Sequence, residues 1–441
     1  MRQLKTFYIR TYGCQMNELD SEIMMGQLEN RGLLRTEIEA DADLLIFNTC
    51  SIRDLAERKV MGKLGQLGKL GRTNPRQPLI GVTGCMANAK KDSLFQKIPH
   101  IDFILGTNNI HDLNNVLDDV LSTGEQAIKT DDHFETELDY LSTKRDDKVK
   151  AHVSIIRGCD KYCTYCVVPY TRGSEVSRHP DSILDECKHL ASQGYKEITL
   201  LGQNVNSYGK DQPDWKCLFH DLLYQIDKIP GIERVRFLTS HPVDITRNLM
   251  EAVRDLKSLC EFVHFPLQAG SDRILKKMHR IYTLEQYLEK VQMLREIVPN
   301  VSLGTDIIVG FPTETEEEFM QTYSMLKQID YSVAFLYSYS ARKGTPAMRW
   351  SDDVPEEVKQ DRLQRLMALQ DTIYARHRQE MVETEIEVLV ESKNIKESTY
   401  LKGRSRCWKN VIFPGAESLI GTLQRIRIHS YSSQTLIGEI V

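Results

Sequence analysis

Residues 157–166 read Arg157-Gly158-Cys159-Asp160-Lys161-Tyr162-Cys163-Thr164-Tyr165-Cys166 and come directly after a strand-like run. Three thiolates separated by three and then two residues can hold three corners of an iron–sulfur cubane. The fourth iron of such a [4Fe–4S] cluster is then open to an outside ligand. Zinc is one alternative, although structural zinc usually takes four ligands, often as paired Cys-x-x-Cys units. Purely structural cysteines are another, and the spacing of Cys159, Cys163 and Cys166 favours the open cluster.

Strand-like and helix-like runs alternate from residue 150 to residue 375. The expected strands are His152–Arg157, Glu197–Leu201, Arg234–Leu238, Phe262–Pro266, Ser302–Val309 and Val333–Ser338. The expected helices include Ser182–Gln193, Thr246–Leu256, Leu284–Ile297 and Glu316–Gln328, and a long helix over Val354–Glu380 follows. Six βα units are too few for a closed eight-stranded barrel. They predict a partial (β/α)6 barrel with functional residues at the carboxyl ends of its strands.

Residues 1–125 alternate in the same way and predict a parallel-sheet α/β domain. Its expected strands are Phe7–Thr11, Leu44–Asn48, Leu79–Thr83 and Phe103–Leu105, and its expected helices are Ser21–Arg31, Ile52–Leu70 and Asn114–Leu121. Cys14, Cys50 and Cys85 each follow a strand, at the edge where open α/β sheets bind ligands. A single cysteine is more often a small buried hydrophobe, but three at equivalent positions favour a second cluster. Residues 126–149 predict an acidic, solvated linker.

Residues 376–441 predict a small all-β barrel of a kind that often binds oligonucleotides, with strands over Ile386–Val390, Val411–Phe413, Leu423–Ile428 and Thr435–Ile440. Within it, residues 402–409 carry four basic side chains and one aromatic ring but no acid. Positive charge follows phosphates, and a ring can stack on an unpaired base. RNA contacts are therefore expected from Lys402, Arg404, Arg406, Trp408 and Lys409. A solvated β-hairpin is the alternative.

The composition restricts the class of protein. The 441 residues hold 57 Lys+Arg against 62 Asp+Glu, and the net charge of −5 excludes a uniformly basic coat but not a local basic patch. No apolar run is long enough for a membrane helix and no signal-peptide core is present, which predicts a cytoplasmic protein without membrane contact. Cytosolic cysteines are mostly reduced. The four that lack spacing partners are expected to be structural: Cys187, Cys217, Cys260 and Cys407.

The motif Cys159-x-x-x-Cys163-x-Tyr165-Cys166 resembles the signature of radical S-adenosylmethionine (SAM) enzymes. With the upstream cysteines and a tail that resembles the TRAM RNA-binding module, essentially the whole chain is similar to the methylthiotransferase family. The branch that modifies N6-dimethylallyladenosine in tRNA is the most similar. The phrases that carry this resemblance are Tyr12-Gly13-Cys14-Gln15-Met16-Asn17, Asn48-Thr49-Cys50-Ser51-Ile52-Arg53, Val167-Val168-Pro169-Tyr170-Thr171-Arg172-Gly173 and Gly202-Gln203-Asn204-Val205-Asn206-Ser207-Tyr208. Thr313 stands where family members often have glycine.

The resemblance implies methylthiolation of C2 of N6-dimethylallyl(isopentenyl)adenosine next to the anticodon of tRNA. It implies two [4Fe–4S] clusters, one held by Cys14, Cys50 and Cys85 and the other by the three cysteines of the loop. SAM would act both as methyl donor and as radical source. The cofactors would carry the chemistry, so no side chain is expected to be catalytic in itself. The expected SAM contacts at the strand ends are Tyr165, Gln203, Asn204, Gln268, Ser271 and Gly310.

The expected partners are the anticodon stem-loop of tRNA, an external one-electron reductant and, as a further candidate, a donor of sulfur or clusters. Two sister branches of the family are alternatives, since they modify threonylcarbamoyl-adenosine in tRNA or an aspartate of a ribosomal protein. An iron–sulfur redox sensor that binds RNA without modifying it is an alternative of a different class. A sensor has no evident need for an open cluster position, which argues against it.

Overall fold

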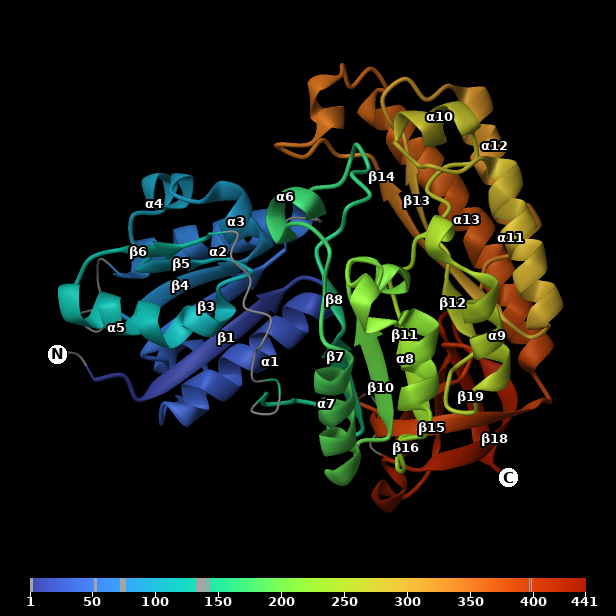
Figure 1. The fold of residues 1–441 in the computed structure, drawn as a ribbon, viewed down its shortest axis with the longest axis horizontal. Coiled ribbons are helices and arrows are strands. Elements are labelled where there is room, and N and C mark those ends of the chain that lie inside the picture. The colour runs from blue at the N-terminus through green and yellow to red at the C-terminus, as the bar shows by residue number, and fades with distance from the viewer. Residues whose placement is uncertain are drawn as a thin grey trace. The chain divides into compact units, whose positions relative to one another are not determined.

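The computed structural model of the protein describes residues 3–50, 54–71, 77–131, 140, 143–395, 397 and 399–441. The chain forms two compact units. The first comprises Met1–Asp146, Arg157–Tyr162 and Cys166–Arg178, and the second comprises Asp147–Ile156, Cys163–Tyr165 and His179–Val441. The loop with three cysteines therefore contributes residues to both units. Figure 1 labels most of the helices and strands of each.

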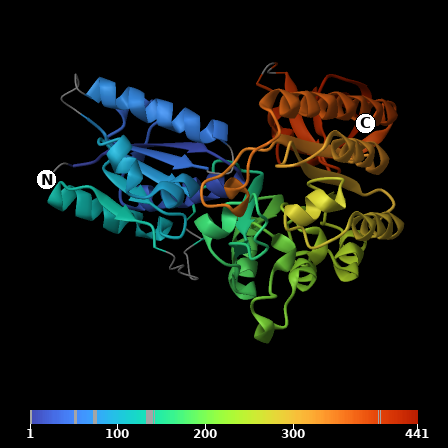
Figure 2. The same ribbon diagram turned by 90° about the horizontal axis from the view of Figure 1, so that it is seen from above.

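The first unit is built on a parallel sheet with the order β2-β1-β3-β4-β5-β6. Its strands are β1 (Thr6–Tyr12), β2 (Leu34–Arg35), β3 (Leu44–Thr49), β4 (Leu79–Gly84), β5 (Phe103–Leu105) and β6 (Ala127–Lys129). One face packs on α1 (Gln15–Asn30) and α5 (Leu113–Thr123), and the other on α2 (Asp54–Gly71), α3 (Cys85–Lys90) and α4 (Ser93–Lys97). Figure 2 shows helices on both sides of the sheet. Because both faces are covered, the central strands β3 and β4 are buried throughout and are mostly apolar.

The four strands expected in this unit are present, and two short strands extend the sheet at its edges. One of them, β6, lies within residues 126–149, so the prediction that this whole segment is a linker is wrong. Helix α1 begins at Gln15 rather than at Ser21, because Cys14 occupies its N-cap. The first two residues of the expected helix Ile52–Leu70 lie outside the described residues, as do 132–139 and 141–142 of the expected linker.

The second unit contains six parallel strands in chain order, divided between two sheets. One sheet pairs β7 (Lys150–Ser154), β10 (Glu197–Leu201) and β11 (Arg234–Phe237), and the other pairs β12 (Phe262–His264), β13 (Ser302–Val309) and β14 (Val333–Ser338). A parallel bridge between Val235 and Leu259 connects the two. The helices that alternate with the strands are α7 (Pro180–Ser192), α8 (Phe219–Ile226), α9 (Arg247–Asp255), α10 (Asp272–Lys277), α11 (Leu284–Ile297) and α12 (Glu316–Ile329). This is the partial barrel that the sequence predicts.

One strand of the partial barrel differs from its prediction. The run expected as a strand over His152–Arg157 is divided, since β7 ends at Ser154 and residues Ile156–Arg157 form β8. Strand β8 pairs with β9 (Val176–Ser177), outside the two barrel sheets. The start of the cysteine loop is therefore tied to the segment that follows the loop.

Helix α13 (Glu356–Met381) leads into a closed barrel with the order β15-β16-β17-β19-β18. Its strands are β15 (Glu385–Lys393), β16 (Tyr400–Ser405), β17 (Asn410–Pro414), β18 (Leu423–Tyr431) and β19 (Thr435–Ile440). The sequence predicts every strand except β16, whose inward positions Gly403 and Ser405 carry no apolar side chain. Across the part of the chain that the structure describes, no helix combines the length and the apolar character needed to cross a bilayer.

Candidate functional site

Three cysteines lie at one edge of the sheet of the first unit. Cys14 follows β1, Cys50 follows β3, and Cys85 begins α3 directly after β4. Strands β1, β3 and β4 are adjacent and parallel, so the three cysteines occupy neighbouring positions at the carboxyl edge. Cys50 and Cys85 are buried, and Cys14 is partly buried.

Two asparagines and a glycine shape this edge. The side-chain amide of Asn17 donates to Oδ1 of Asn48 (3.0 Å), and that of Asn48 donates to the backbone oxygen of Asn17 (2.8 Å). Gly84 has φ +90°, and a Cβ there would lie 2.4 Å from the carbonyl oxygen of Thr49. Sequence reasoning assigned no role to Asn17 or Asn48, although both fall in phrases that carry the family resemblance.

The thiols of this edge ionise differently. A hydrogen bond with Cys50 lowers the pKa of Cys14 to about 6, with help from the positive charge of Arg172 and against the effect of burial. Burial raises the pKa of Cys85, and Arg172 opposes that rise. The edge therefore favours a thiolate at Cys14, and the thiolate is the form of cysteine that binds metals.

A buried carboxylate connects helix α1 to both ends of the cysteine loop. Asp20 accepts hydrogen bonds from Nη2 of Arg157 and from Nη2 of Arg172, each at 3.0 Å. The side chain of Asp20 is fully buried, and neither arginine side chain is more than 5% exposed. Arg157 lies two residues before Cys159, and Arg172 ends the short helix α6 (Val168–Arg172) beyond the last cysteine. The sequence pattern indicated none of these three residues as part of a site.

The cysteine loop itself has a tight beginning and a buried centre. Gly158 has φ +76°, and a Cβ there would lie 1.8 Å from the carbonyl oxygen of Ser174, so glycine is required before Cys159. Cys163 is buried, and its sulfur accepts a hydrogen bond from Nη1 of Arg280 at 3.2 Å. The other two cysteines of the loop are partly buried.

The donor chemistry of both cysteine sets fits iron–sulfur clusters. Among the described residues, no three His, Cys, Asp or Glu side chains are grouped closely enough to hold a single metal ion. A cubane makes a different demand, because each of its cysteines binds a different iron. Sulfur-only donors with a buried guanidinium beside them, Arg172 in one set and Arg280 in the other, suit an anionic thiolate-ligated cluster.

Three of the residues expected to contact SAM lie where tight backbone or aromatic packing holds them. Gln268 is buried with φ +72°. Gly310 follows β13 with φ +69°, and a Cβ there would lie 2.3 Å from Cγ of Lys359. The ring of Tyr165 lies edge-on to that of Phe311, with centroids 6.4 Å apart. Gln268 and Gly310 therefore both adopt left-handed backbone conformations, and the main chain of Gly310 lies close to Lys359.

The other three expected SAM contacts are polar residues. The hydroxyl of Ser271 caps α10 and donates to Oε1 of Glu318 at 3.0 Å, so it has two partners within the chain. The side-chain amide of Asn204 donates to Asp244 at 2.8 Å. Gln203 lies just beyond the end of β10 and is partly buried.

Three of the five expected RNA contacts pack against the partial barrel. Trp408 stacks on Phe262 with ring centroids 5.1 Å apart. Arg406 forms an ion pair with Glu261 at 2.8 Å, and Nζ of Lys409 donates to a backbone oxygen just before β14 at 3.1 Å. The ring of Trp408 and the charges of Arg406 and Lys409 are used within the chain, and an RNA contact by these three side chains stays a prediction.

The remaining two basic residues stay on the outside of the closed barrel. Lys402 and Arg404 are partly buried on the same face of β16, because Leu401, Gly403 and Ser405 point inward. Arg404 lies 3.3 Å from Glu391, with its side chain 20% exposed. An RNA contact by this pair stays a prediction.

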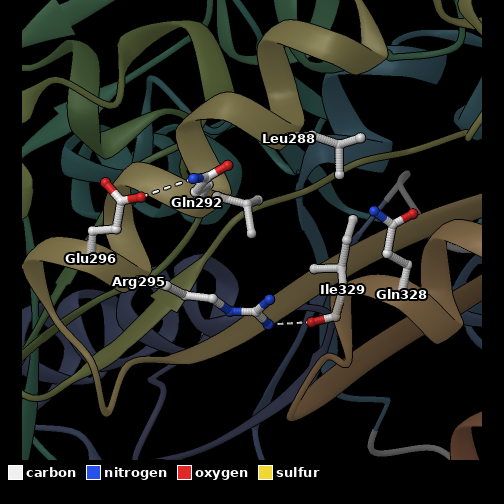
Figure 3. A pocket seen from close by; sticks show the side chains of 7 residues that line it. Leu288, Gln292, Arg295, Glu296, Gln328 and Ile329 are labelled. Atoms are coloured by element: carbon white, nitrogen blue, oxygen red, sulfur yellow. Dashed lines mark hydrogen bonds between the residues drawn. The ribbon is translucent and has the colours of Figure 1, made fainter.

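A shallow pocket lies on the outer helices α11 and α12 of the partial barrel (Figure 3). Its lining residues are Leu288, Val291, Gln292, Arg295, Glu296, Gln328 and Ile329. The helices of βα units run antiparallel to the strands, so the end of α12 marks the amino-terminal side of the barrel. Ligands of such barrels bind at the opposite end, and none of the expected site residues lines this pocket.

Comparisons with known proteins agree with this arrangement. Residues 6–106 match a family described as uncharacterized protein family UPF0004, and residues 153–326 match the radical SAM superfamily. A tRNA-2-methylthio-N(6)-dimethylallyladenosine synthase from Protochlamydia amoebophila is 76% identical over 440 residues, which cover 100% of this chain and 97% of that protein. The protein of the same name from Clostridium botulinum (strain Loch Maree / Type A3) is 46% identical over 98% of this chain and 96% of its own length.

Among solved structures, the radical SAM methyltransferase TsrM from Kitasatospora setae, with cobalamin and a [4Fe–4S] cluster bound, is similar in fold. Its TM-score is 0.57 at 14% sequence identity, covering 78% of this chain and 77% of that one. The cobalamin-dependent radical enzyme OxsB has a TM-score of 0.51 at 12% identity, covering 85% of this chain and 56% of that one. At these identities the likeness concerns the fold alone.

Proposed function

The chain belongs to the family of tRNA-2-methylthio-N(6)-dimethylallyladenosine synthases, and from this premise we propose that six of its cysteines, in two sets of three, hold two iron–sulfur clusters. The protein is a radical SAM methylthiotransferase, and its substrate is dimethylallyladenosine in tRNA. The observation that carries the function is the 76% identity along the whole chain. The assignment of individual residues rests on the geometry of the two units.

In this proposal, Cys14, Cys50 and Cys85 hold one [4Fe–4S] cluster, and Cys159, Cys163 and Cys166 hold the other. When bound, the clusters and SAM supply the sulfur, methyl and radical chemistry that an unreactive adenine C–H requires. The chain supplies thiolates, orientation and exclusion of water. The lowered pKa of Cys14 and the buried guanidinium of Arg172 support thiolate ligation at the sheet edge.

The SAM contacts are proposed at the carboxyl ends of the barrel strands, where partial barrels hold their ligands. Tyr165 offers a ring within the cysteine loop, and Gly310 offers a main chain without a side chain at the end of β13, where the stem of Lys359 packs against it. Gln203, Asn204 and Gln268 complete the set at the ends of β10 and β12. Ser271 is left out, because its hydroxyl caps α10 and binds Glu318.

The tRNA contact is proposed on the outer face of the closed barrel, with Lys402 and Arg404 as its basic residues. The adenosine next to the anticodon suits this enzyme, because bases of a loop are unpaired and can be turned out into a pocket. An external one-electron reductant is needed for radical chemistry, and a sulfur or cluster donor is a further candidate partner. We propose the cytoplasm as the site of action.

The test is nucleoside mass spectrometry of tRNA from a bacterial strain that lacks its own enzyme of this kind and expresses this chain. Methylthiolated dimethylallyladenosine should appear with the natural chain and not with Cys163→Ala. If only the hypermodified threonylcarbamoyl-adenosine gains a methylthio group, the sister branch is correct. If SAM and dithionite yield no cleavage product with anaerobically reconstituted protein, the enzymatic assignment fails and the sensor alternative gains support.

A further inference from the structure

The centre of the cysteine loop is fastened to the C-terminus of α10. The backbone N–H of Thr164 donates to the carbonyl oxygen of Met278 at 3.1 Å, and its hydroxyl donates to that of Lys277 at 2.9 Å. These are carbonyls that a helix leaves without an intrahelical partner at its C-terminus. Thr164 stands between Cys163 and Tyr165, so the position of Cys163 depends on this helix end.

The same helix end presents a buried arginine to Cys163. The N–H of Arg280 donates to the oxygen of Leu275 and that of His279 donates to the oxygen of Lys276, which together make a Schellman motif. His279 adopts the left-handed conformation that this motif requires, with φ +58°. The backbone of Arg280 is therefore fixed before its side chain makes any contact.

The guanidinium of Arg280 reaches three acceptors and is surrounded by protein. Nη1 donates to the sulfur of Cys163 (3.2 Å), Nε to the hydroxyl of Tyr282 (3.1 Å) and Nη2 to the oxygen of Pro266 (3.4 Å). Arg280 is 7% exposed, and within the described chain none of these acceptors is a carboxylate. Buried charges are normally compensated by an opposite charge. Of these acceptors, the sulfur of Cys163 is the one that would belong to an anionic cluster.

Tyr282 completes the frame around this arginine. Its hydroxyl donates to the oxygen of Leu267 at 2.9 Å, directly before Gln268. Arg280 and Tyr282 therefore tie the cysteine loop to the segment that follows β12, where SAM contacts are expected. The arrangement differs from that of Arg172, which has a carboxylate partner in Asp20.

We propose that Arg280 is a positioning residue that donates a hydrogen bond to the cluster-ligating sulfur of Cys163 and raises the reduction potential of that cluster. The inference rests on the proposed assignment of Cys159, Cys163 and Cys166 as cluster ligands. Reduction adds one electron and makes the cluster more negative. A cation and an N–H donor at a ligand sulfur stabilise the reduced form more than the oxidised form, because hydrogen bonds to sulfur and local charge set cluster potentials.

The test uses the full chain with Cys14, Cys50 and Cys85 all replaced by alanine, so that only the loop cluster remains. In this background, Arg280→Met should retain its iron. In a redox titration followed by EPR, its ratio of reduced to oxidised cluster at a given applied potential should be at least tenfold lower than in the parent. For a one-electron couple, tenfold corresponds to a shift of about 59 mV to lower potential. Arg280→Lys keeps the charge and should recover part of the shift. Lys276→Met removes an exposed cation from the same helix and should leave the potential unchanged.

A second measurement reports on the contact between Arg280 and the cluster and not on the potential. The protein with Cys14, Cys50 and Cys85 replaced by alanine, labelled with 15N in its arginine guanidinium groups, should show a 15N hyperfine coupling to the reduced loop cluster in pulsed EPR, and Arg280→Lys should remove it. The proposal is overturned if Arg280→Met keeps its iron and its cluster has the same reduction potential as the parent. It is also overturned if the labelled protein shows no 15N coupling. These outcomes differ from failure of the proposed function, in which the parent protein itself would hold no SAM-responsive cluster.

Discussion

Asp20 and Arg172 form a fully buried ion pair, with 3.0 Å between Oδ2 and Nη2. The other carboxylate oxygen of Asp20 binds Arg157 at the same distance. One carboxylate thus binds two guanidinium groups, one just before and one just after the cysteine loop, and its single negative charge is shared between them. Removing one partner of a buried ion pair leaves an uncompensated charge, which is more harmful than removing the whole pair.

Replacement of Asp20 by Asn should therefore destabilise the first unit by about 3–5 kcal/mol, the range found when a buried pair loses one partner. Hydrogen exchange of the amides in β1, β3 and β4, followed by mass spectrometry, measures this unit directly. Asp118→Asn is the matched control, because Asp118 pairs with Arg31 at the surface and its side chain is 64% exposed. Equal protection in the two variants would show that Asp20 has no compensating role.

Substitutions in the two cysteine sets should abolish different steps of the reaction. Cys163→Ala should lose the loop cluster and all reductive cleavage of SAM, while the iron bound at the sheet edge remains. Cys50→Ala should keep SAM cleavage but make no methylthiolated tRNA. Iron analysis, a cleavage assay with dithionite and nucleoside mass spectrometry on both anaerobically reconstituted variants measure these losses. Methylthiolated product from Cys50→Ala would refute the role of the sheet-edge set, and the exposed Lys276→Met variant should behave like the parent.

The sequence indicated most of the architecture, because its cysteines and its strand-like runs are local signals. Glu197–Leu201, Ser302–Val309 and Leu284–Ile297 begin and end as predicted, since each is a periodic run with clear breakers on both sides. Strands β2 and β6 were missed because two- and three-residue edge strands have almost no pattern of their own. Their existence depends on the backbone of the neighbouring strand.

The arginines around the cysteines could not be predicted from the sequence. Arg172 and Arg280 are recognisable only when Asp20 and Cys163 are placed beside them in space. The basic run of the closed barrel makes contacts that the sequence pattern does not show. A cluster of Arg, Lys and Trp suggests a nucleic-acid partner. In the structure, Arg406 pairs with an acidic residue of the partial barrel and Trp408 stacks on one of its rings. Composition alone does not distinguish such partners within the chain from a nucleic acid.

Arg406 should matter for stability and little for RNA. Arg406→Gln breaks the ion pair with Glu261 and should lower the midpoint of urea unfolding of the second unit. All three tryptophans lie in this unit, so their fluorescence reports on it. The affinity for tRNA and its dependence on salt should stay within twofold of the parent, whereas Lys402→Gln should weaken binding and reduce the salt slope. Arg425→Gln, with a side chain 74% exposed, is the control for stability.

Gly310 should not tolerate a side chain. An alanine there would combine an unfavourable φ of +69° with a Cβ placed 2.3 Å from Lys359. Gly194 has φ +92° with open space around it, so Gly194→Ala measures the backbone strain alone. We expect Gly310→Ala to lower the unfolding midpoint more than Gly194→Ala and to weaken SAM binding in equilibrium dialysis. Equal midpoints in the two variants would mean that Lys359 moves aside without cost.

Glu314 should make the stability of the second unit depend on pH. Burial raises the pKa of Glu314 from its ordinary value of 4.5 to about 7, although the N–H of Gly310 (2.6 Å) and the guanidinium of Arg362 (3.0 Å) bind its Oε2 atom. Arg362 is shared with Glu316, and the negative charge of Glu318 also disfavours ionisation. Between pH 4.5 and about 7, the folded protein binds more protons at this carboxyl than the unfolded chain does. The free energy of unfolding therefore falls as pH rises through this range, and above it the contribution of Glu314 is constant.

The measurement is urea unfolding of apo-protein at pH 5.5 and at pH 8, followed by tryptophan fluorescence. From the lower to the higher pH, the parent should lose up to about 2 kcal/mol relative to Glu314→Gln, because each pH unit within the window is worth about 1.4 kcal/mol. Glu289→Gln, an exposed carboxylate on α11, controls for a general change in charge. If the free energy of unfolding changes equally in the parent and in Glu314→Gln between the two pH values, the buried carboxyl is ionised throughout. Arg362 would then hold it in the ionised form.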